Sequence, residues 1–215
     1  MKAFEKILGI PLGGEPKENI HVFSVELDGY KRSLHNGLFN YSAALYLGNV
    51  SSRNESARFK NAAAETASQF TRSEVKIDYR QLLTPYWEFH TNLKLQHSSN
   101  TLHDSEKLQL GGANGVRGYG DGDASGDEGY LSSTEFVWHT KVPGLTFNAF
   151  FDIGGAGDKL AHDIQTIRSW GTGVGYSKPN DYFFKFEYAR KIGNNKNVTS
   201  DYTRNRLWFI AGKIF

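Results

Sequence analysis

Cysteine is absent from the 215 residues of this chain. Its absence excludes disulfide bonds, thiolate metal sites and cysteine nucleophiles. An excess of one charge is also lacking, because 25 basic residues stand against 23 acidic ones and leave a formal net charge of +2. This balance gives no reason to expect a nucleic-acid partner.

Long apolar runs are missing as well: no stretch approaches the ~18–20 residues that a membrane-spanning helix needs. A barrel strand would escape this test, because only its alternate residues face lipid. Residues Met1–Gly14 contain a short apolar patch, Ile7–Leu12, but no clear cleavage site for a signal peptide follows it. We expect residues 1–16 to be a leader or linker remnant and residues 17–215 to form the folded domain.

Glycine and aromatic residues are plentiful, with 23 glycines and 14% aromatic residues against only 5 prolines, and this composition favours β structure. Apolar and polar residues alternate with a period of two over much of the chain. In Thr71–Gln81 the even positions, from Arg72 to Arg80, are all charged, and a strand places them on one face. The same alternation marks Phe23–Leu27, Phe39–Leu47, Trp87–Gln96, Tyr130–Val142, Leu145–Ile153, Ile167–Ser177, Tyr182–Tyr188 and Arg204–Phe215.

The pattern predicts about nine strands, most of ~10–13 residues, which suits membrane-spanning strands better than the shorter strands of globular proteins. Two tight turns and four long polar connections separate them: Asn36-Gly37 and Lys178–Asp181, then Gly48–Gln69, Gln96–Gly129, Gly154–Gln165 and Gly193–Thr203. Short turns at one end and long loops at the other are typical of outer-membrane barrels. A soluble β-sandwich is the alternative. Residues Asn61–Ser68 predict either a short helix or the start of a strand.

One glycine-rich segment breaks the alternation. Residues Leu110–Glu135 read LGGANGVRGYGDGDASGDEGYLSSTE and contain four motif elements: Gly111-Gly112, Val116-Arg117-Gly118-Tyr119, Gly126-Asp127-Glu128-Gly129 and Glu135. A further element, Phe150-Phe151-Asp152-Ile153-Gly154, follows. Together these elements resemble the signature of two-partner secretion transporters, the TpsB family of haemolysin-activator type, over roughly Phe70–Phe215.

The resemblance implies an all-β fold, an antiparallel transmembrane β-barrel of outer-membrane type. This chain would supply about nine C-terminal strands of a parent sixteen-stranded barrel, without the periplasmic POTRA domains that recognise substrate. It also implies a place in the outer membrane of a Gram-negative cell and secretion of a large partner exoprotein of TpsA type. Outer-membrane lipid and the barrel-assembly machinery would be further partners.

The resemblance also implies that the motif loop, residues 98–129, folds into the barrel lumen. Arg117 would anchor it by pairing with Asp152, with Glu135 as a second acceptor. A guanidinium suits this role because it stays charged and offers five donors in a fixed geometry. Tyr119 would pack the loop tip against a strand. The remaining residues that shape the loop are Val116, Gly118, Gly111, Gly112, Gly126, Asp127 and Gly129.

No motif calls for a cofactor, a metal ion or catalysis. The glycine-rich segment lacks the Gly-Lys-Ser/Thr of a phosphate loop, and the calcium-like start at Asp121 has Ser132 where a bidentate glutamate is needed. Two alternatives to secretion remain open. One is an assembly or insertion factor of the same superfamily. The other is a barrel-embedded hydrolase that combines, for example, His97 with Ser132 or Ser133.

Overall fold

The computed structural model describes residues 15–32, 37–159, 163–193 and 203–213, and the backbone of two short strands before them. Its main element is one antiparallel sheet of nine strands in the order β13-β12-β11-β10-β9-β6-β5-β4-β3. The strands are β3 (Glu18–Arg32), β4 (Gly37–Ser52), β5 (Gln69–Thr84), β6 (Trp87–Ser98), β9 (Glu128–His139), β10 (Leu145–Gly157), β11 (Gln165–Ser177), β12 (Tyr182–Ile192) and β13 (Asn205–Lys213). The predicted meander of about nine long strands is confirmed.

Smaller elements lie outside the sheet. A two-stranded pair, β1 (Lys6–Ile7) and β2 (Ile10–Pro11), precedes it, and a second pair, β7 (Leu108–Gln109) and β8 (Ser125–Gly126), lies within the long β6–β9 connection. Helix α1 (Glu55–Ala63) fills the β4–β5 connection, and a 3₁₀ turn, η1 (Asp104–Glu106), follows β6. Among the described residues, no helix is long and apolar enough to cross a membrane.

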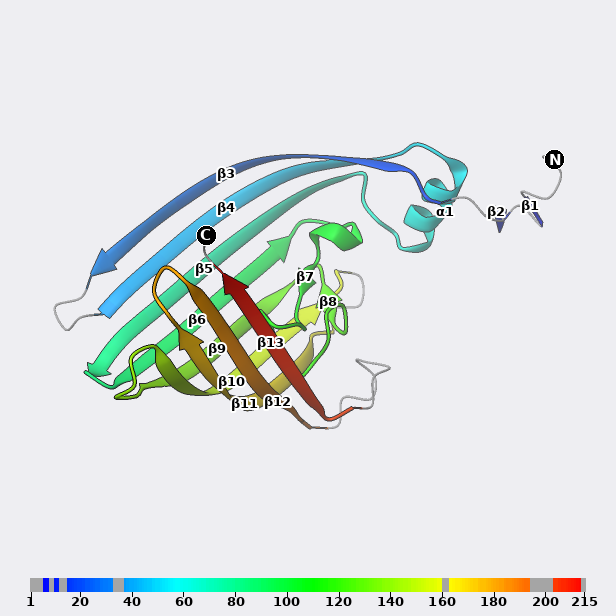
Figure 1. Cartoon of the computed structure of the whole chain (residues 1–215). Helices are drawn as coiled ribbons and strands as arrows, with labels where there is room; N and C mark the ends of the chain where they lie inside the picture. Colours follow the sequence, from blue (N-terminus) through cyan, green and yellow to red (C-terminus); the bar gives the residue numbers. More distant parts are fainter. Residues whose placement is uncertain are drawn as a thin grey trace.

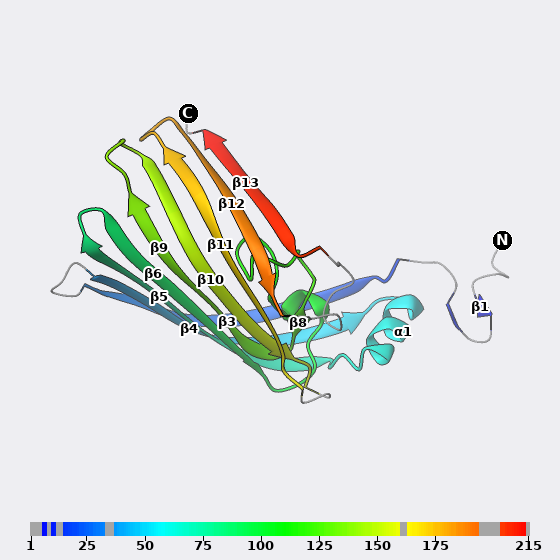
Figure 2. The same cartoon turned by 90° about the horizontal axis from the view of Figure 1, so that it is seen from below.

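The sheet is strongly bowed and open (Figures 1 and 2). Within the described residues, β3 pairs only with β4 and β13 only with β12, so the two edge strands do not meet. Figure 2 shows the short turns gathered at one end of the sheet and helix α1 at the other, where the long connections lie. This arrangement agrees with the predicted division into short turns and long loops.

Alternation assigns each strand two chemically different faces. We call the face that packs against the motif loop the inner face and the opposite one the outer face. The outer face carries exposed aromatic side chains, and some stack across strands: Trp138 lies 6.3 Å from Trp87 and 5.7 Å from Phe147 between ring centroids. Large aromatic side chains such as Phe136, Trp138 and Phe147 are therefore exposed on this face.

The connections refine the sequence prediction. The helix lies at Glu55–Ala63, earlier than the predicted Asn61–Ser68, because Asn54 caps it by accepting a hydrogen bond from the backbone N–H of Ala57 at 2.9 Å. The predicted turn before β12 is confirmed, and Asn180 adopts a left-handed φ of 57° there. Asn36, Phe215 and most of Gly193–Thr203 lie outside the described residues.

Candidate functional site

The tip of the motif loop is a compact turn held by its own backbone. Val116 N–H donates to the Leu110 carbonyl at 2.7 Å, and Gly112 N–H donates to the Tyr119 carbonyl at 3.0 Å. Gly112 has a φ of +101°, a conformation that side chains with a Cβ rarely adopt. A Cβ on Gly111 would lie 2.0 Å from the carbonyl oxygen of Gly120. The paired glycines therefore allow the two arms of the turn to touch.

Arg117 lies at the centre of the contact between the loop and the inner face, and its side chain is 7% exposed. Nε and Nη2 donate to the two carboxylate oxygens of Asp152 at 3.0 and 2.8 Å, and Arg117 N–H donates to the same residue at 3.1 Å. Nη1 donates to Glu135 and to Glu187, both at 2.7 Å. Nη2 also reaches the hydroxyl of Ser133 at 3.0 Å. One guanidinium thus joins side chains from three strands, β9, β10 and β12.

An aromatic ring completes the surroundings of this guanidinium. The Arg117 Cζ lies 3.2 Å from the ring centroid of Phe150, a close cation–π contact. The ring fits because its neighbour on β11 is Gly171, where a Cβ would lie 2.2 Å from a ring carbon. Burial alone would lower the pKa of Arg117, but its hydrogen bonds to Asp152 and Glu135 raise that pKa above its ordinary value. The side chain therefore remains charged although it is buried.

The loop extends from this anchor across β11 and β12 to the edge strand. Gly118 N–H donates to the Ser169 hydroxyl at 3.1 Å, and a Cβ on Gly118 would lie 2.7 Å from the Cβ of Ser169. The Lys191 ammonium lies 4.7 Å from the ring centroid of Tyr119. Trp208 Nε1, on β13, donates to the carbonyl of Arg117 at 2.7 Å. The tip therefore contacts every strand from β9 to β13.

A small apolar core fixes the tip to the strands beneath it. Tyr119 is fully buried in it, so the structure places this ring against strand residues. The buried members are Leu108, Leu110, Val116, Tyr119, Ala156 and Ile167.

A buried carboxylate ties down the base of the loop. Asp127 is fully buried and accepts hydrogen bonds from the backbone N–H groups of Leu102 at 2.9 Å and Lys159 at 2.8 Å. The flanking glycines lie against β10: a Cβ on Gly126 would lie 2.7 Å from backbone atoms of that strand, and one on Gly129 would lie 2.0 Å from a carbonyl oxygen. This motif element therefore closes the loop where β9 begins.

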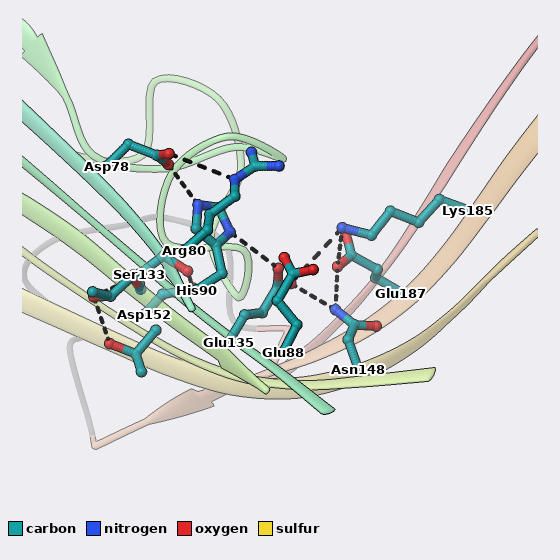
Figure 3. Close-up of polar contacts among 12 residues, drawn as sticks. Asp78, Arg80, Glu88, His90, Ser133, Glu135, Asn148, Asp152, Lys185 and Glu187 are labelled. Carbon is teal, nitrogen blue, oxygen red and sulfur yellow. Dashed lines mark hydrogen bonds and ion pairs between the residues drawn. The ribbon is translucent and has the colours of Figure 1, made fainter. Parts of the chain in front are cut away.

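Further charged groups extend the anchor along the inner face (Figure 3). His90 lies between Asp78 and Glu135, with its Nδ1 3.9 Å from a Glu135 oxygen. The Lys185 ammonium lies 2.8 Å from Glu187 and 3.8 Å from Glu135. Lys185 adds positive charge to a cluster in which the carboxylates outnumber the motif arginine.

The structure brings Arg117, Asp152 and Glu135 into direct contact, as the sequence prediction has it. Sequence reasoning missed the other members, which are Ser133, Asn148, Phe150, Ser169, Glu187 and Trp208. The sequence contains one sign that residues of this sheet face are closely packed. Glycines alternate at 171, 173 and 175 on the inner face of β11, and a Cβ on Gly173 would lie 2.5 Å from Asn148. A row of glycines on one face indicates that something lies close above it.

The side chains suggested for a hydrolase have other partners. His97 is exposed and pairs with Glu128 at 2.9 Å. Ser132 donates to a backbone carbonyl of β6 at 2.8 Å, and Ser133 donates to Asp152 at 2.7 Å. Within the described ranges, no group of three or more His, Cys, Asp or Glu side chains is placed to hold a metal ion.

Comparison with known proteins identifies a family. The family model described as "Haemolysin secretion/activation protein ShlB/FhaC/HecB" matches residues 17–177. The heme/hemopexin transporter protein HuxB of Haemophilus influenzae (strain 86-028NP) is 27% identical over 211 residues, covering 93% of this chain and 37% of HuxB. The outer membrane transporter CdiB of Dickeya dadantii (strain 3937) is 30% identical over 118 residues, which are 53% of this chain and 21% of that protein.

A solved structure supports the fold. CdiB from Escherichia coli superposes with a TM-score of 0.69 at 19% identity, over 90% of this chain and 37% of that one. The match to HuxB covers nearly all of this chain. The chain, however, spans only 37% of the length of HuxB.

Proposed function

Because the chain belongs to the haemolysin secretion/activation protein family (ShlB/FhaC/HecB), we propose that it forms part of an outer-membrane transporter that secretes a large partner exoprotein. The observation that carries the proposal is the division of one long-stranded sheet into an aromatic outer face and a charged inner face against which a loop is anchored. The outer face suits lipid and the inner face suits a hydrated passage.

The open edges of the sheet support a larger barrel. Strands β3 and β13 each leave one row of backbone N–H and C=O groups without a sheet partner among the described residues. Unpaired backbone groups are very unfavourable in lipid, where no water can satisfy them. Further strands must therefore complete the wall, and the share of HuxB that this chain spans is consistent with them.

Arg117 has a positioning role in this proposal. Its contacts join the loop to three strands. They hold the loop in one part of the passage and keep it out of the rest of the passage. Secretion by this route breaks no covalent bond. The inner face needs only to provide a polar surface and to anchor the motif loop against part of it.

The test compares secreted proteins. The gene is disrupted in its own bacterium, and proteins in the medium are measured by mass spectrometry before and after complementation. We expect disruption to remove one very large protein from the medium and the wild-type gene to restore it. Arg117→Ala should fail to restore it. Arg80→Ala is the control and should restore it. Arg80 lies on the inner face of β5, but it is 56% exposed and pairs with Asp78 at 3.5 Å.

Two results would overturn the proposal. An unchanged medium after disruption would exclude a role in secretion. A changed set of outer-membrane proteins with an unchanged medium would indicate an assembly or insertion factor instead.

A further inference from the structure

Two arginines lie on the outer face of the sheet, close to the end where the long connections lie (Figure 2). Ser169 on β11 and Glu187 on β12 contact the motif loop from the inner face. Arg168 and Arg190 have the opposite parity on the same strands, so their exposed side chains point outward. In the ladder between the strands, Arg190 pairs with Trp170, the next outer-face residue after Arg168. The two arginines are therefore diagonal neighbours, ~7–8 Å apart.

The arginines mark the end of an uncharged surface. Between them and the short turn at Lys178–Asp181, each outer-face position of the two strands carries an uncharged side chain. On β12 these positions are Tyr182, Phe184, Phe186 and Tyr188, and on β11 they are Trp170, Thr172, Val174 and Tyr176. Arg168 and Lys178 lie about ten residues apart, which is ~33 Å of extended chain and ~25 Å of height at the usual strand tilt.

This height equals that of the apolar band of an outer-membrane barrel, so the arginines lie at the level of the lipid head groups. Long connections are extracellular in such barrels, and Arg168 and Arg190 are at the end where the long connections of this sheet lie. The head groups beside them are therefore those of the outer leaflet.

Neither arginine has an ionic partner among the residues that the structure describes. The residues opposite them in the ladders are Ile153 and Ile192 for Arg168, and Trp170 and Asn205 for Arg190. None of these side chains is acidic. The inner-face arginines Arg80 and Arg117, by contrast, each contact a carboxylate. Two adjacent like charges repel each other, so an anion from outside the protein would stabilise this pair.

A lipid phosphate has the chemistry that this surface lacks. A guanidinium presents its N–H donors in a planar fork that matches phosphate oxygens, and two such groups side by side can share one phosphate. Trp170 and Tyr188 lie one step closer to the short turns, with ring centroids 6.4 Å apart. Trp and Tyr rings are typical of the boundary between head groups and acyl chains. A cationic contact and an apolar contact thus lie in the order that one lipid molecule requires.

We propose that Arg168 and Arg190 bind a phosphate group of lipid A, the phosphorylated glycolipid of the outer leaflet of the outer membrane. The proposal rests on the outer-membrane location in the proposed function and adds a lipid site to it. The two guanidinium groups hold the phosphate, and Trp170 packs against an acyl chain. The bound lipid fixes the height in the membrane of β11 and β12, the strands that hold the motif loop through Ser169 and Glu187.

Native mass spectrometry in detergent micelles tests the proposal on the protein purified from its own outer membrane and freed of lipid. Lipid A is added, and the lipid-bound fraction is measured for the wild type and for the double variant Arg168→Gln/Arg190→Gln. Both side chains are exposed, so the substitutions leave the fold intact. Arg80→Gln is the control, because it removes an exposed arginine from the inner face, which lipid does not reach.

We expect the double variant to bind lipid A about tenfold more weakly than the wild type, because charge-assisted hydrogen bonds are lost. We expect Arg80→Gln to bind it as the wild type does. Lipid A without its phosphates but with the same acyl chains should bind the wild type as weakly as intact lipid A binds the double variant.

Undiminished binding of lipid A by the double variant would overturn the proposal, and so would equal binding of the form without phosphates. Displacement of lipid A by inorganic phosphate at the same concentration would also overturn it, because the arginines would then take a free anion. The proposed function fails on a different observation, an unchanged medium after gene disruption, so the two failures are distinguishable.

Discussion

Removal of the Arg117 side chain is the perturbation whose effect follows most directly from the structure. Arg117→Ala deletes hydrogen bonds to Asp152, Glu135 and Glu187 together and leaves these carboxylates close to one another with fewer cations among them. Asp152 is fully buried, so water cannot replace the lost donors easily. Removing one partner of a buried ion pair typically costs about 3–5 kcal/mol, and we expect Arg117→Ala to lower the free energy of unfolding by about that amount.

A double-mutant cycle isolates the pairing. Asp152→Asn keeps the shape of the side chain and removes its charge. The two changes together should cost less than the sum of the single changes, with an interaction energy of about 1–3 kcal/mol. The free energy of unfolding is measured by urea titration of the protein in detergent micelles, with tryptophan fluorescence as the signal.

Arg80→Ala is the control, because it removes an arginine from the inner face of the sheet and leaves Arg117 in place. Arg80 is mostly exposed and lies 3.5 Å from Asp78, so its removal should change the free energy of unfolding by no more than about 0.5 kcal/mol. Equal effects of the Arg80 and Arg117 substitutions, or strictly additive effects in the cycle, would refute the reasoning.

Three further substitutions test other contacts of the loop. Gly118→Val should displace the tip from β11, because even a Cβ there lies 2.7 Å from a strand side chain; faster protease cleavage of the loop would report this, and an unchanged rate would contradict it. Asp127→Ala should leave two backbone N–H groups without an acceptor and cost about 1–3 kcal/mol, measured by urea titration, whereas a neutral result would mean that water replaces the carboxylate. Trp208→Phe keeps an aromatic ring but loses the hydrogen bond to the Arg117 carbonyl, so it should cost only about 1 kcal/mol in the same titration, and a much larger loss would indicate a packing role.

The strands were predictable because their information is local. In Thr71–Gln81 every even position carries a charged residue and every odd position an uncharged one, and the pleat of a strand converts that alternation directly into two faces. The helix position was not predictable in the same way. Asn54 and Ala57 decide it through one capping bond, while the alanines that suggested Asn61–Ser68 reflect propensity alone.

The candidate site was predictable in part. Arg117, Asp152 and Glu135 stand in recognisable motifs, and the structure places them in contact. Glu187 and Trp208 stand in no motif, and the sequence identifies them only as residues of later strands. They reach Arg117 because the sheet bows and carries β12 and β13 over the loop, at sequence separations of 70 and 91 residues.

The sequence by itself determined the strands, their order as a meander and the polarity of the two faces, because alternation and turns act over a few residues. Only the tertiary structure decided which side chains surround Arg117. These depend on the curvature of the sheet and on the path of the loop across it, which arise from contacts between residues far apart in the chain. The contacts of Glu187 and Trp208 with Arg117 are therefore properties of the fold that no single segment encodes.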